Sequence, residues 1–225
     1  NGYTKQLGII GYPVEHTFSP NMHNFISETV HNNYVYGAWC VKPEDLKDAI
    51  NGMRALGISG INVTAPHKVE VMKYIDVVTD GAKKLGSVNT VVNRDGKLYG
   101  YNTDADGFCM ALTKAGIEIE NSRILIIGAG GVVRPTLIRL IDYKPKSITV
   151  VNRTKSKVKM LAEDILKSTG FEVNTEIDKL EFDIVINTTS AGMEPQENVM
   201  PIDNIEEIND LSFINENTAA VDMIY

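Results

Sequence analysis

Short apolar runs bounded by turn residues alternate along the chain with longer stretches in which apolar residues recur at helical spacing. This alternation is typical of β-α-β units, in which a helix follows each strand and the strands form a mostly parallel sheet. The sequence therefore predicts an α/β protein.

The first half of the chain contains three strand–helix repeats followed by a hairpin. The expected strands are 6–11, 35–41 and 58–63, and the expected helices are 20–29, 43–56 and 68–75. Two further strands, 87–93 and 97–101, flank Asp95-Gly96, a dipeptide that favours the positive φ angles of a tight turn. We expect this antiparallel hairpin to close the first half.

The second half returns to the alternation. The expected elements are a helix over 104–114, strands over 123–128, 147–152 and 182–188 with helices between them, and a last strand over 219–225. Because no Pro/Ser-rich linker interrupts the chain, we expect a short hinge near 102–104, between a first domain of residues 1–103 and a second of residues 104–225.

Composition and charge narrow the class of protein. The 22 basic and 29 acidic side chains give a net charge of −7, which argues against a nucleic-acid partner. No apolar run approaches the roughly 20 residues of a membrane-spanning helix, and residues 1–6 lack the apolar stretch of a signal peptide. Two cysteines, Cys40 and Cys109, cannot build a disulfide framework. We expect a cytoplasmic protein.

Two kinds of chemistry lack a motif. The four histidines, His16, His23, His31 and His67, do not have the spacing of a metal site. No serine lies in G-x-S-x-G, so the sequence does not favour a hydrolase of that type.

A glycine turn follows the expected strand 123–128. Gly128-Ala129-Gly130-Gly131 opens a helical stretch, where Gly128 permits a tight turn and Gly130 lets the backbone approach a pyrophosphate at a helix N-terminus. The third position of the dinucleotide fingerprint is Val133 instead of Gly. Glycines also end strands for structural reasons alone, so the turn by itself leaves both interpretations open.

The end of the next strand favours NADP over NAD. In NAD-binding chains an acidic residue at this place binds the ribose 2′-hydroxyl, whereas an arginine accommodates a 2′-phosphate. This chain has Asn152-Arg153-Thr154 and no carboxylate there. Alternatively, Thr154 caps the next helix and Arg153 is a solvated surface residue, although capping and phosphate binding are compatible.

The first half carries three polar segments near expected helix starts. Ser19 is expected to cap the helix that Pro20 opens, and the hydroxyls of Thr17 and Ser19 would also suit a small carboxylate. Lys68 is expected in the first turn of a helix, where the dipole disfavours a cation, so we expect a carboxylate near it or else a solvated lysine. Asp104 at a helix start is favourable as a dipole partner alone.

Taken in order, these segments resemble the shikimate/quinate dehydrogenase family over nearly the whole chain. The matching segments are Gly11-Tyr12-Pro13, His16-Thr17-Phe18-Ser19-Pro20, His23-Asn24, Asn62-Val63-Thr64-Ala65-Pro66-His67-Lys68, Gly86-Ser87-Val88-Asn89-Thr90, Asn102-Thr103-Asp104, Gly128-Ala129-Gly130-Gly131, Asn152-Arg153-Thr154, Asn187-Thr188-Thr189-Ser190-Ala191-Gly192-Met193 and Asp222-Met223-Ile224-Tyr225.

The resemblance implies an N-terminal α/β substrate domain, a Rossmann-like NADP-binding domain and an active site in the cleft between them. It implies NADPH-dependent reversible reduction of 3-dehydroshikimate to shikimate, in the biosynthesis of chorismate and aromatic amino acids. The implied partners are this small-molecule substrate and NADP, with no nucleic acid, metal or membrane, and the implied assembly is a monomer or a homodimer.

The resemblance also implies roles for individual residues. Lys68 and Asp104 form the catalytic pair, with Lys68 as the proton donor to the carbonyl oxygen. The residues implied to bind the substrate are Thr17, Ser19, Asn62, Thr64, Lys68, Asn89, Asp104 and Tyr225. The residues implied to bind the cofactor are Gly128, Ala129, Gly130, Gly131, Asn152, Arg153, Thr154, Thr188 and Met193.

The chain departs from the family pattern at a few places. Thr17 stands where the family most often has Ser, which leaves quinate open as a substrate. The family's C-terminal segment, which returns to the first domain, does not follow Tyr225. A chain that binds NADP without turnover and an enzyme with relaxed substrate or cofactor choice are therefore the alternatives.

Overall fold

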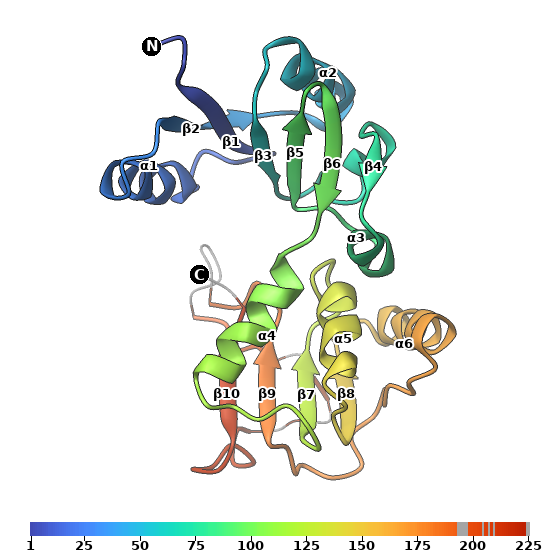
Figure 1. The fold of residues 1–225 in the computed structure, drawn as a ribbon. Coiled ribbons are helices and arrows are strands. Elements are labelled where there is room, and N and C mark those ends of the chain that lie inside the picture. The colour runs from blue at the N-terminus through green and yellow to red at the C-terminus, as the bar shows by residue number, and fades with distance from the viewer. Residues whose placement is uncertain (193–197, 204, 207, 209, 224–225) are drawn as a thin grey trace. The chain divides into compact units, whose positions relative to one another are not determined.

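The structure is a computed structural model of residues 1–225, and it describes residues 1–192, 198–203, 205–206, 208 and 210–223. The chain forms two compact units, Asn1–Asp104 and Ala105–Tyr225 (Figure 1). Both are built on a central sheet with helices packed on it, so the predicted α/β class is confirmed.

The first unit has a six-stranded sheet of order β2-β1-β3-β5-β6-β4. Its strands are β1 (Lys5–Gly11), β2 (Tyr34–Cys40), β3 (Gly60–Val63), β4 (Val77–Val78), β5 (Thr90–Arg94) and β6 (Lys97–Tyr101). β1, β2 and β3 are parallel, whereas β5 is antiparallel to both β3 and β6. Asp95 and Gly96 between β5 and β6 have positive φ angles of 53° and 84°, which confirms the predicted hairpin.

The helical elements of this unit are α1 (Ser19–Thr29), η1 (Pro43–Asp45), α2 (Leu46–Ala55), η2 (Glu70–Lys73) and α3 (Asp80–Leu85). Leu46, Ile50 and Met53 lie on one side of α2 and pack on Ile61 of β3 and Val91 of β5 in the main core of the unit. This core supports the strand ends that carry the polar segments.

The expected helix over 68–75 is wrong. Residues 65–69 form turns, and only the four-residue 3₁₀ helix η2 follows. The Lys68 carbonyl accepts a 2.7 Å hydrogen bond from the N–H of Val88, and the Met72 N–H bonds the Val69 carbonyl at 3.3 Å, the spacing of a 3₁₀ turn. Lys68 is thus not in the first turn of an α-helix, and the expected dipole penalty does not apply to it.

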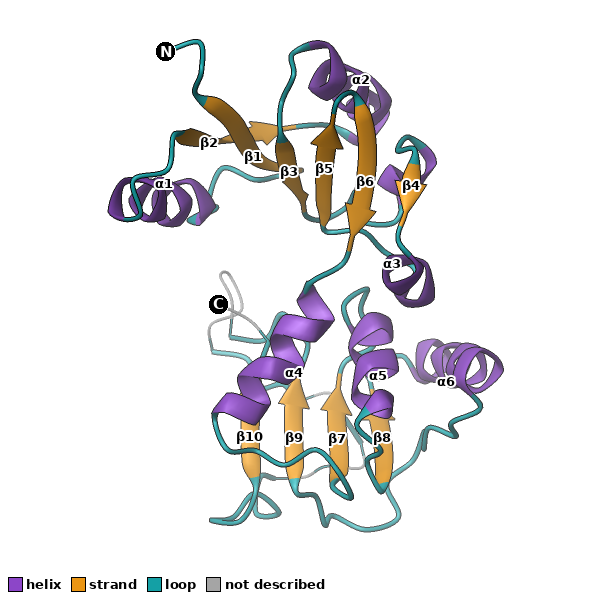
Figure 2. Ribbon diagram, in the orientation of Figure 1, coloured by secondary structure: helices purple, strands orange, loops and turns teal. Residues whose placement is uncertain are grey.

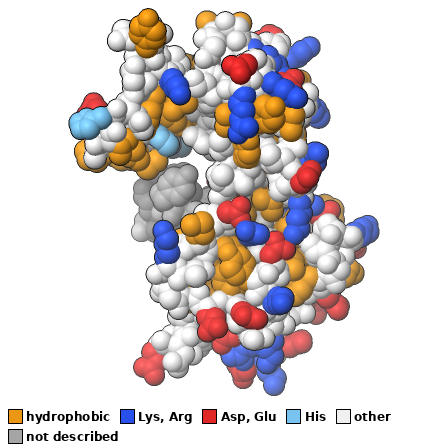
Figure 3. Space-filling view, in the orientation of Figure 1, with side chains coloured by type: hydrophobic (Ala, Val, Ile, Leu, Met, Phe, Trp, Pro, Cys, Tyr) orange, Lys and Arg blue, Asp and Glu red, His pale blue; other side chains and the backbone are white. Residues whose placement is uncertain are grey.

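Helix α1 begins differently from the prediction and is held by polar contacts. Phe18 occupies the N-cap position without a side-chain cap, so Ser19 is the first helical residue and not the cap. Met22 and Phe25, with Phe18, lie exposed on α1, and Figure 3 shows hydrophobic side chains gathered there. Asn24 instead joins α1 to β2 through two hydrogen bonds to the backbone of Tyr36.

The second unit has a four-stranded parallel sheet of order β10-β9-β7-β8. Its strands are β7 (Arg123–Ile127), β8 (Ser147–Val151), β9 (Ile184–Asn187) and β10 (Ala219–Asp222), and its helices are α4 (Asp104–Lys114), α5 (Val133–Asp142) and α6 (Lys155–Thr169). In Figure 2, α4 and α5 lie side by side across one face of the sheet. The parallel order places the carboxyl ends of β7, β8 and β9 at one edge.

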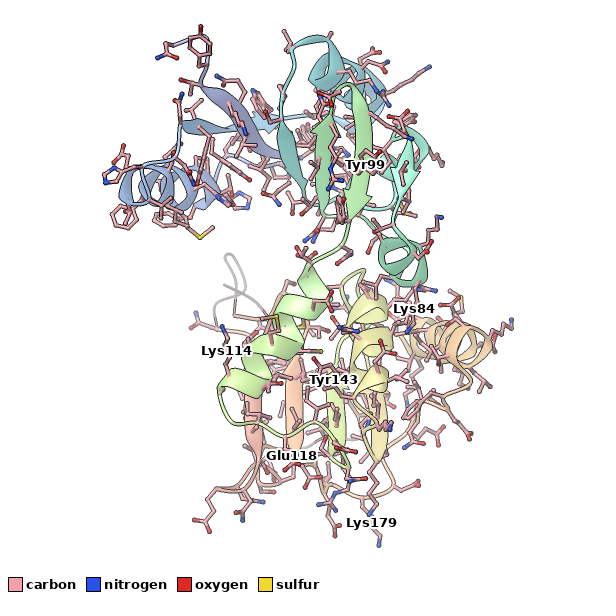
Figure 4. All side chains as sticks on the ribbon, in the orientation of Figure 1. Lys84, Tyr99, Lys114, Glu118, Tyr143 and Lys179 are labelled. Atoms are coloured by element: carbon pink, nitrogen blue, oxygen red, sulfur yellow. The ribbon has the colours of Figure 1, made fainter. Side chains whose placement is uncertain are left out.

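Helix α4 carries charges that suit both of its ends. It begins with Asp104 and has Lys114, labelled in Figure 4, as the last residue. Negative charge is favourable near a helix N-terminus and positive charge near the C-terminus. The predicted helix over 104–114 is confirmed with the same bounds.

Arg123 and Asp183 join the amino-terminal edge of β7 to the start of β9. The Asp183 carboxylate accepts hydrogen bonds from the Arg123 backbone N–H (2.7 Å), Nε (3.1 Å) and Nη2 (3.0 Å). The hydrogen bonds from Arg123 hold the pKa of Asp183 below its ordinary value. Glu181 contacts the same guanidinium through one hydrogen bond of 2.8 Å.

We expect Asp183→Asn to lower the free energy of unfolding at neutral pH by more than Glu181→Gln does. The folded pKa of Asp183 is depressed, so its contribution is fully present above the unfolded pKa of about 3.9 and is lost as the pH falls through the lower folded value. Urea unfolding at neutral pH and at about pH 3 should show the gap between wild type and Asp183→Asn narrowing in acid. A gap of equal size at both pH values would contradict this account.

Candidate functional site

Lys68 and Asp104 form an ion pair in the first unit. Lys68 Nζ lies 2.7 Å from Asp104 Oδ2, and the two side chains are 34% and 37% exposed. The turn over 65–69 carries Lys68, and the first residue of α4 carries Asp104. The carboxylate expected near Lys68 is therefore present, and the ammonium has both a counter-ion and access to water.

Asn89 binds the other oxygen of Asp104. Asn89 Nδ2 donates to Asp104 Oδ1 at 2.6 Å and to Thr103 Oγ1 at 3.0 Å. The Asp104 backbone N–H donates to Asn102 Oδ1 at 3.1 Å, and the buried amide of Asn102 donates to Ser87. The carboxylate is thus held on both oxygens by donors from two separate segments of the chain.

The other expected substrate residues lie at the ends of strands β1 and β3 or beyond them. Asn62 is on β3, and Thr64 directly follows β3. A Cβ at Gly11 would lie 2.4 Å from Thr64 Cγ2, so the end of β1 packs closely on Thr64. The Thr17 and Ser19 hydroxyls lie 3.1 Å apart at the start of α1. Tyr225 lies outside the described residues.

The second unit contains a cavity of about 340 Å³ at the carboxyl ends of its strands. Its described lining includes Gly128, Ala129, Gly130, Asn152, Arg153, Thr154, Lys157, Thr188, Thr189, Ser190 and Ala191, with apolar residues near Met200. The structure thus brings together seven of the nine expected cofactor residues. Gly131 is not among the lining residues, and Met193 lies outside the described residues.

The two glycines of the turn face different constraints. Gly128 has φ of 118°, and a Cβ there would lie 2.3 Å from Thr188 Oγ1, whose hydroxyl is bonded to the Ile127 carbonyl. A Cβ at Gly130 would meet no protein atom within 4 Å, although Gly130 lines the cavity. The fold itself therefore requires Gly128, whereas Gly130 leaves space on the cavity side, as the approach of a pyrophosphate requires.

Cationic and hydroxyl groups gather at the β8 end of the cavity. Arg153, Thr154 and Lys157 line it, and none of its described lining residues carries a carboxylate. Thr154 occupies the N-cap position of α6 without a side-chain cap, so the expected capping hydrogen bond is absent. Lys157 was missed by the sequence analysis, although it lies three residues after Thr154 and hence on the same side of a helix that begins there. This group of side chains suits a phosphate.

Two negative findings apply to the part of the chain that the structure describes. It contains no cluster of three or more His, Cys, Asp or Glu side chains able to hold a metal ion. No helix within it is long and apolar enough to cross a membrane.

Comparison with known proteins gives two family matches that together cover most of the chain. Residues 9–91 match the shikimate dehydrogenase substrate binding domain, and residues 110–222 match the shikimate / quinate 5-dehydrogenase family. A shikimate dehydrogenase (NADP(+)) of Geobacillus sp. (strain WCH70) is 44% identical over 98% of this chain and 79% of its own length.

Solved structures agree with the sequence matches. A crystal structure of shikimate dehydrogenase in complex with NADP⁺ is 40% identical, with a TM-score of 0.91 over 100% of this chain and 78% of its own. The shikimate dehydrogenase of Thermus thermophilus, in complex with NADP(H) and shikimate, is 30% identical, with a TM-score of 0.81 over 97% of this chain and 78% of its own.

The contrast between the two glycines can be measured. We expect Gly128→Ala to lower the free energy of unfolding of the ligand-free chain by about 2 kcal/mol, because alanine disfavours a positive φ and its Cβ would clash with Thr188. Gly130→Ala should change the stability by less than about 0.5 kcal/mol and weaken dinucleotide binding about tenfold or more. Chemical unfolding and titration with NADP⁺ measure the two effects. Equal stability losses in both variants would contradict the conclusion that the fold requires a glycine at position 128 and not at position 130.

Proposed function

The chain belongs to the shikimate dehydrogenase family, and we propose that it catalyses the NADP-dependent reversible reduction of 3-dehydroshikimate to shikimate with Lys68 and Asp104 as its catalytic residues. It is an NADP-dependent oxidoreductase that acts on a CH–OH group. The observation that carries the choice of catalytic residues is the 2.7 Å contact between Lys68 Nζ and Asp104 Oδ2.

Lys68 supplies the proton of the reduction. NADPH, when bound, supplies the hydride that reaches the carbonyl carbon, and the carbonyl oxygen takes a proton from the Lys68 ammonium. The Lys68 side chain is 34% exposed, so it can regain that proton from water. In the reverse direction Lys68 accepts the proton of the substrate hydroxyl.

Asp104 and Asn89 keep the ammonium in place. The carboxylate stabilises the charged form of Lys68 and directs its Nζ, while the remaining acceptor capacity of its oxygens is available to a substrate hydroxyl. Asn89 donates to Asp104 Oδ1 and so holds the carboxylate plane. The pair is therefore oriented before substrate binds, which lowers the entropic cost of reaching the reactive geometry.

The substrate carboxylate is assigned to Thr17 and Ser19, because two hydroxyls lie together at the start of α1, where the helix dipole favours an anion. Asn62 and Thr64 at the end of β3 are assigned to substrate hydroxyls, with Tyr225 as a further carboxylate contact. The Thr17 methyl group, which a serine would lack, is the feature that favours quinate as an alternative substrate.

The cofactor residues fit NADP. Gly128, Gly130 and the start of α5 are assigned to the pyrophosphate, because Gly130 has no side chain to block its approach. Arg153 and Lys157 are assigned to the 2′-phosphate, because no described lining residue carries a carboxylate that would repel it. From the family resemblance, Gly131 is also assigned to the pyrophosphate, Met193 to the nicotinamide and Thr188 to the cofactor. We assign residues 1–103 to substrate binding and residues 104–225 to NADP binding.

The setting of the enzyme is a further part of the proposal. Cys40 and Cys109 are free thiols, one exposed and one buried, which suits a reducing compartment, so we place the chain in the cytoplasm. We propose that it acts as a monomer or a homodimer, which sedimentation will distinguish.

Lys68→Ala should lower kcat for shikimate oxidation by about two orders of magnitude or more and change the Kd for NADP⁺ little, because the proton-transfer group is lost while the cofactor residues are intact. Lys73→Ala is the matched control, since Lys73 is an exposed lysine of the same segment that pairs only with Glu70 in the described contacts. The assay is the rise of NADPH absorbance when the protein is mixed with NADP⁺ and shikimate. A parallel assay with quinate compares the two substrates. Near-normal turnover by Lys68→Ala would remove Lys68 from the catalytic role.

Arg153→Ala and Lys157→Ala should each weaken NADP⁺ binding about tenfold and leave NAD⁺ binding nearly unchanged, because both cations are assigned to the 2′-phosphate. Lys159→Ala is the control, since Lys159 lies on the same helix α6 and does not line the cavity. Calorimetric titrations with both dinucleotides measure the effect. Equal losses for NADP⁺ and NAD⁺ would contradict the assignment.

A further inference from the structure

Hydrogen bonds in the first unit connect a tyrosine on the edge strand β2 to the Asp104 carboxylate. The Tyr36 hydroxyl lies 2.7 Å from Asn62 Oδ1, and Asn62 Nδ2 lies 3.2 Å from Thr90 Oγ1. The Thr90 hydroxyl lies 2.9 Å from Asn89 Oδ1, and Asn89 Nδ2 lies 2.6 Å from Asp104 Oδ1. These contacts form a continuous chain that ends on the proposed catalytic carboxylate.

The direction of the chain is determined at Asn62. Asn62 Nδ2 also donates to the Asn89 backbone carbonyl at 3.4 Å, and a carbonyl oxygen can only accept. The amide nitrogen therefore faces Asn89 and Thr90, and Oδ1 faces Tyr36, whose hydroxyl must donate. Burial raises the pKa of Tyr36 well above its ordinary value, so this hydroxyl keeps its proton.

The direction is determined again at Asn89. Its Oδ1 accepts a 3.0 Å hydrogen bond from the Thr103 backbone N–H, which can only donate. Thr90 must therefore donate to this oxygen and accept from Asn62. Asn89 then has only its Nδ2 group to present to Asp104, where it donates to a carboxylate that can only accept.

The sheet holds the members of the chain in register. Asn62 and Thr90 are direct partners on the antiparallel strands β3 and β5, so their side chains lie on the same face. Tyr36 is buried, and its ring stacks on His23 with a centroid separation of 4.2 Å. Asn24 Nδ2 donates to the Tyr36 carbonyl, and Asn24 Oδ1 accepts from the Tyr36 N–H, so Tyr36 is fixed on β2.

We propose that Tyr36 and Thr90 are positioning residues for the reaction, which hold the Asn89 amide in the orientation that donates to Asp104. This inference rests on the proposed function of Lys68 and Asp104. Without the Tyr36 hydroxyl, Asn62 Oδ1 loses its buried donor, so the Asn62 amide that donates to Thr90 is held less firmly, and so is the Thr90 hydroxyl. Asn89 Oδ1 keeps the hydrogen bond from the Thr103 N–H, but the Thr90 hydroxyl no longer holds it firmly from the other side, so the amide that donates to Asp104 is held less firmly.

Tyr36→Phe tests the far end of the chain, because it removes the hydroxyl and keeps the buried ring. We expect kcat for shikimate oxidation to fall about tenfold while the KM for NADP⁺ stays unchanged. Tyr34→Phe is the matched control on the same strand, since the Tyr34 hydroxyl donates to the His23 carbonyl and lies outside the chain. This control should keep the wild-type kcat.

Thr90→Val and Thr90→Ser test the middle of the chain. Valine keeps the β-branched shape and removes the hydroxyl, so kcat should again fall about tenfold, whereas serine keeps the hydroxyl and should restore kcat to near the wild-type value. The double variant Tyr36→Phe/Thr90→Val should have a kcat about tenfold below the wild-type value, because the first substitution already interrupts the series of hydrogen bonds.

Two results would overturn the proposal. One is a Tyr36→Phe enzyme that matches Tyr34→Phe in kcat, and the other is a double variant that loses about a hundredfold, as independent sites would. If the wild-type protein does not reduce NADP⁺ with shikimate, the proposed function fails. The wild type, Tyr36→Phe, Thr90→Val and the double variant are then compared in free energy of unfolding. If the double variant loses less free energy of unfolding than the sum of the two single variants, the result supports the hydrogen-bonded chain. If the two losses add, the result overturns it.

Discussion

The ion pair of Lys68 and Asp104 joins the turn over 65–69 to the first residue of α4, with Lys68 Nζ 2.7 Å from Asp104 Oδ2. Asn89 binds the second oxygen of Asp104, and the first turn of α4 favours its negative charge. The hydrogen bond from the Val88 N–H to the Lys68 carbonyl connects the turn over 65–69 to the segment that carries Asn89. The proposed proton donor and its counter-ion are therefore positioned by contacts with other segments of the chain as well as by their mutual attraction.

The second unit uses a different constraint to make its site. The glycine turn after β7 must bend at Gly128, where Thr188 of the neighbouring strand end leaves no room for a side chain. The bend directs the chain into α5 and leaves the cavity open at Gly130, while the next strand end supplies Arg153 and Lys157. The cavity thus leaves space at Gly130, and its cationic end suits the 2′-phosphate that we assign to it.

Much of this was predictable because the signals are local. All strands except β4 follow from short apolar runs, and α4 has the same bounds in the sequence and in the structure. The errors came where a distant segment competes for a backbone group, as at Lys68, or where a local contact replaces another, as when Thr17 Oγ1 accepts from the Ser19 N–H and Phe18 takes the N-cap position. The two-residue strand β4 was missed because its pairing with β6 comes from tertiary packing and leaves no pattern in so short a segment.

The sequence by itself determined the α/β class, the glycine turn, the lack of a carboxylate after β8 and the identity of the candidate catalytic residues, because each depends on residue types within a short stretch or on the order of motifs. The tertiary structure shows the implied pair of Lys68 and Asp104 as a 2.7 Å contact. Only the tertiary structure decided that Lys157 lines the cavity beside Arg153, and that Tyr36 is linked to Asp104 through Asn62, Thr90 and Asn89. Those relations join residues far apart in the chain, and strand register and backbone hydrogen bonds place them, so no local pattern contains them.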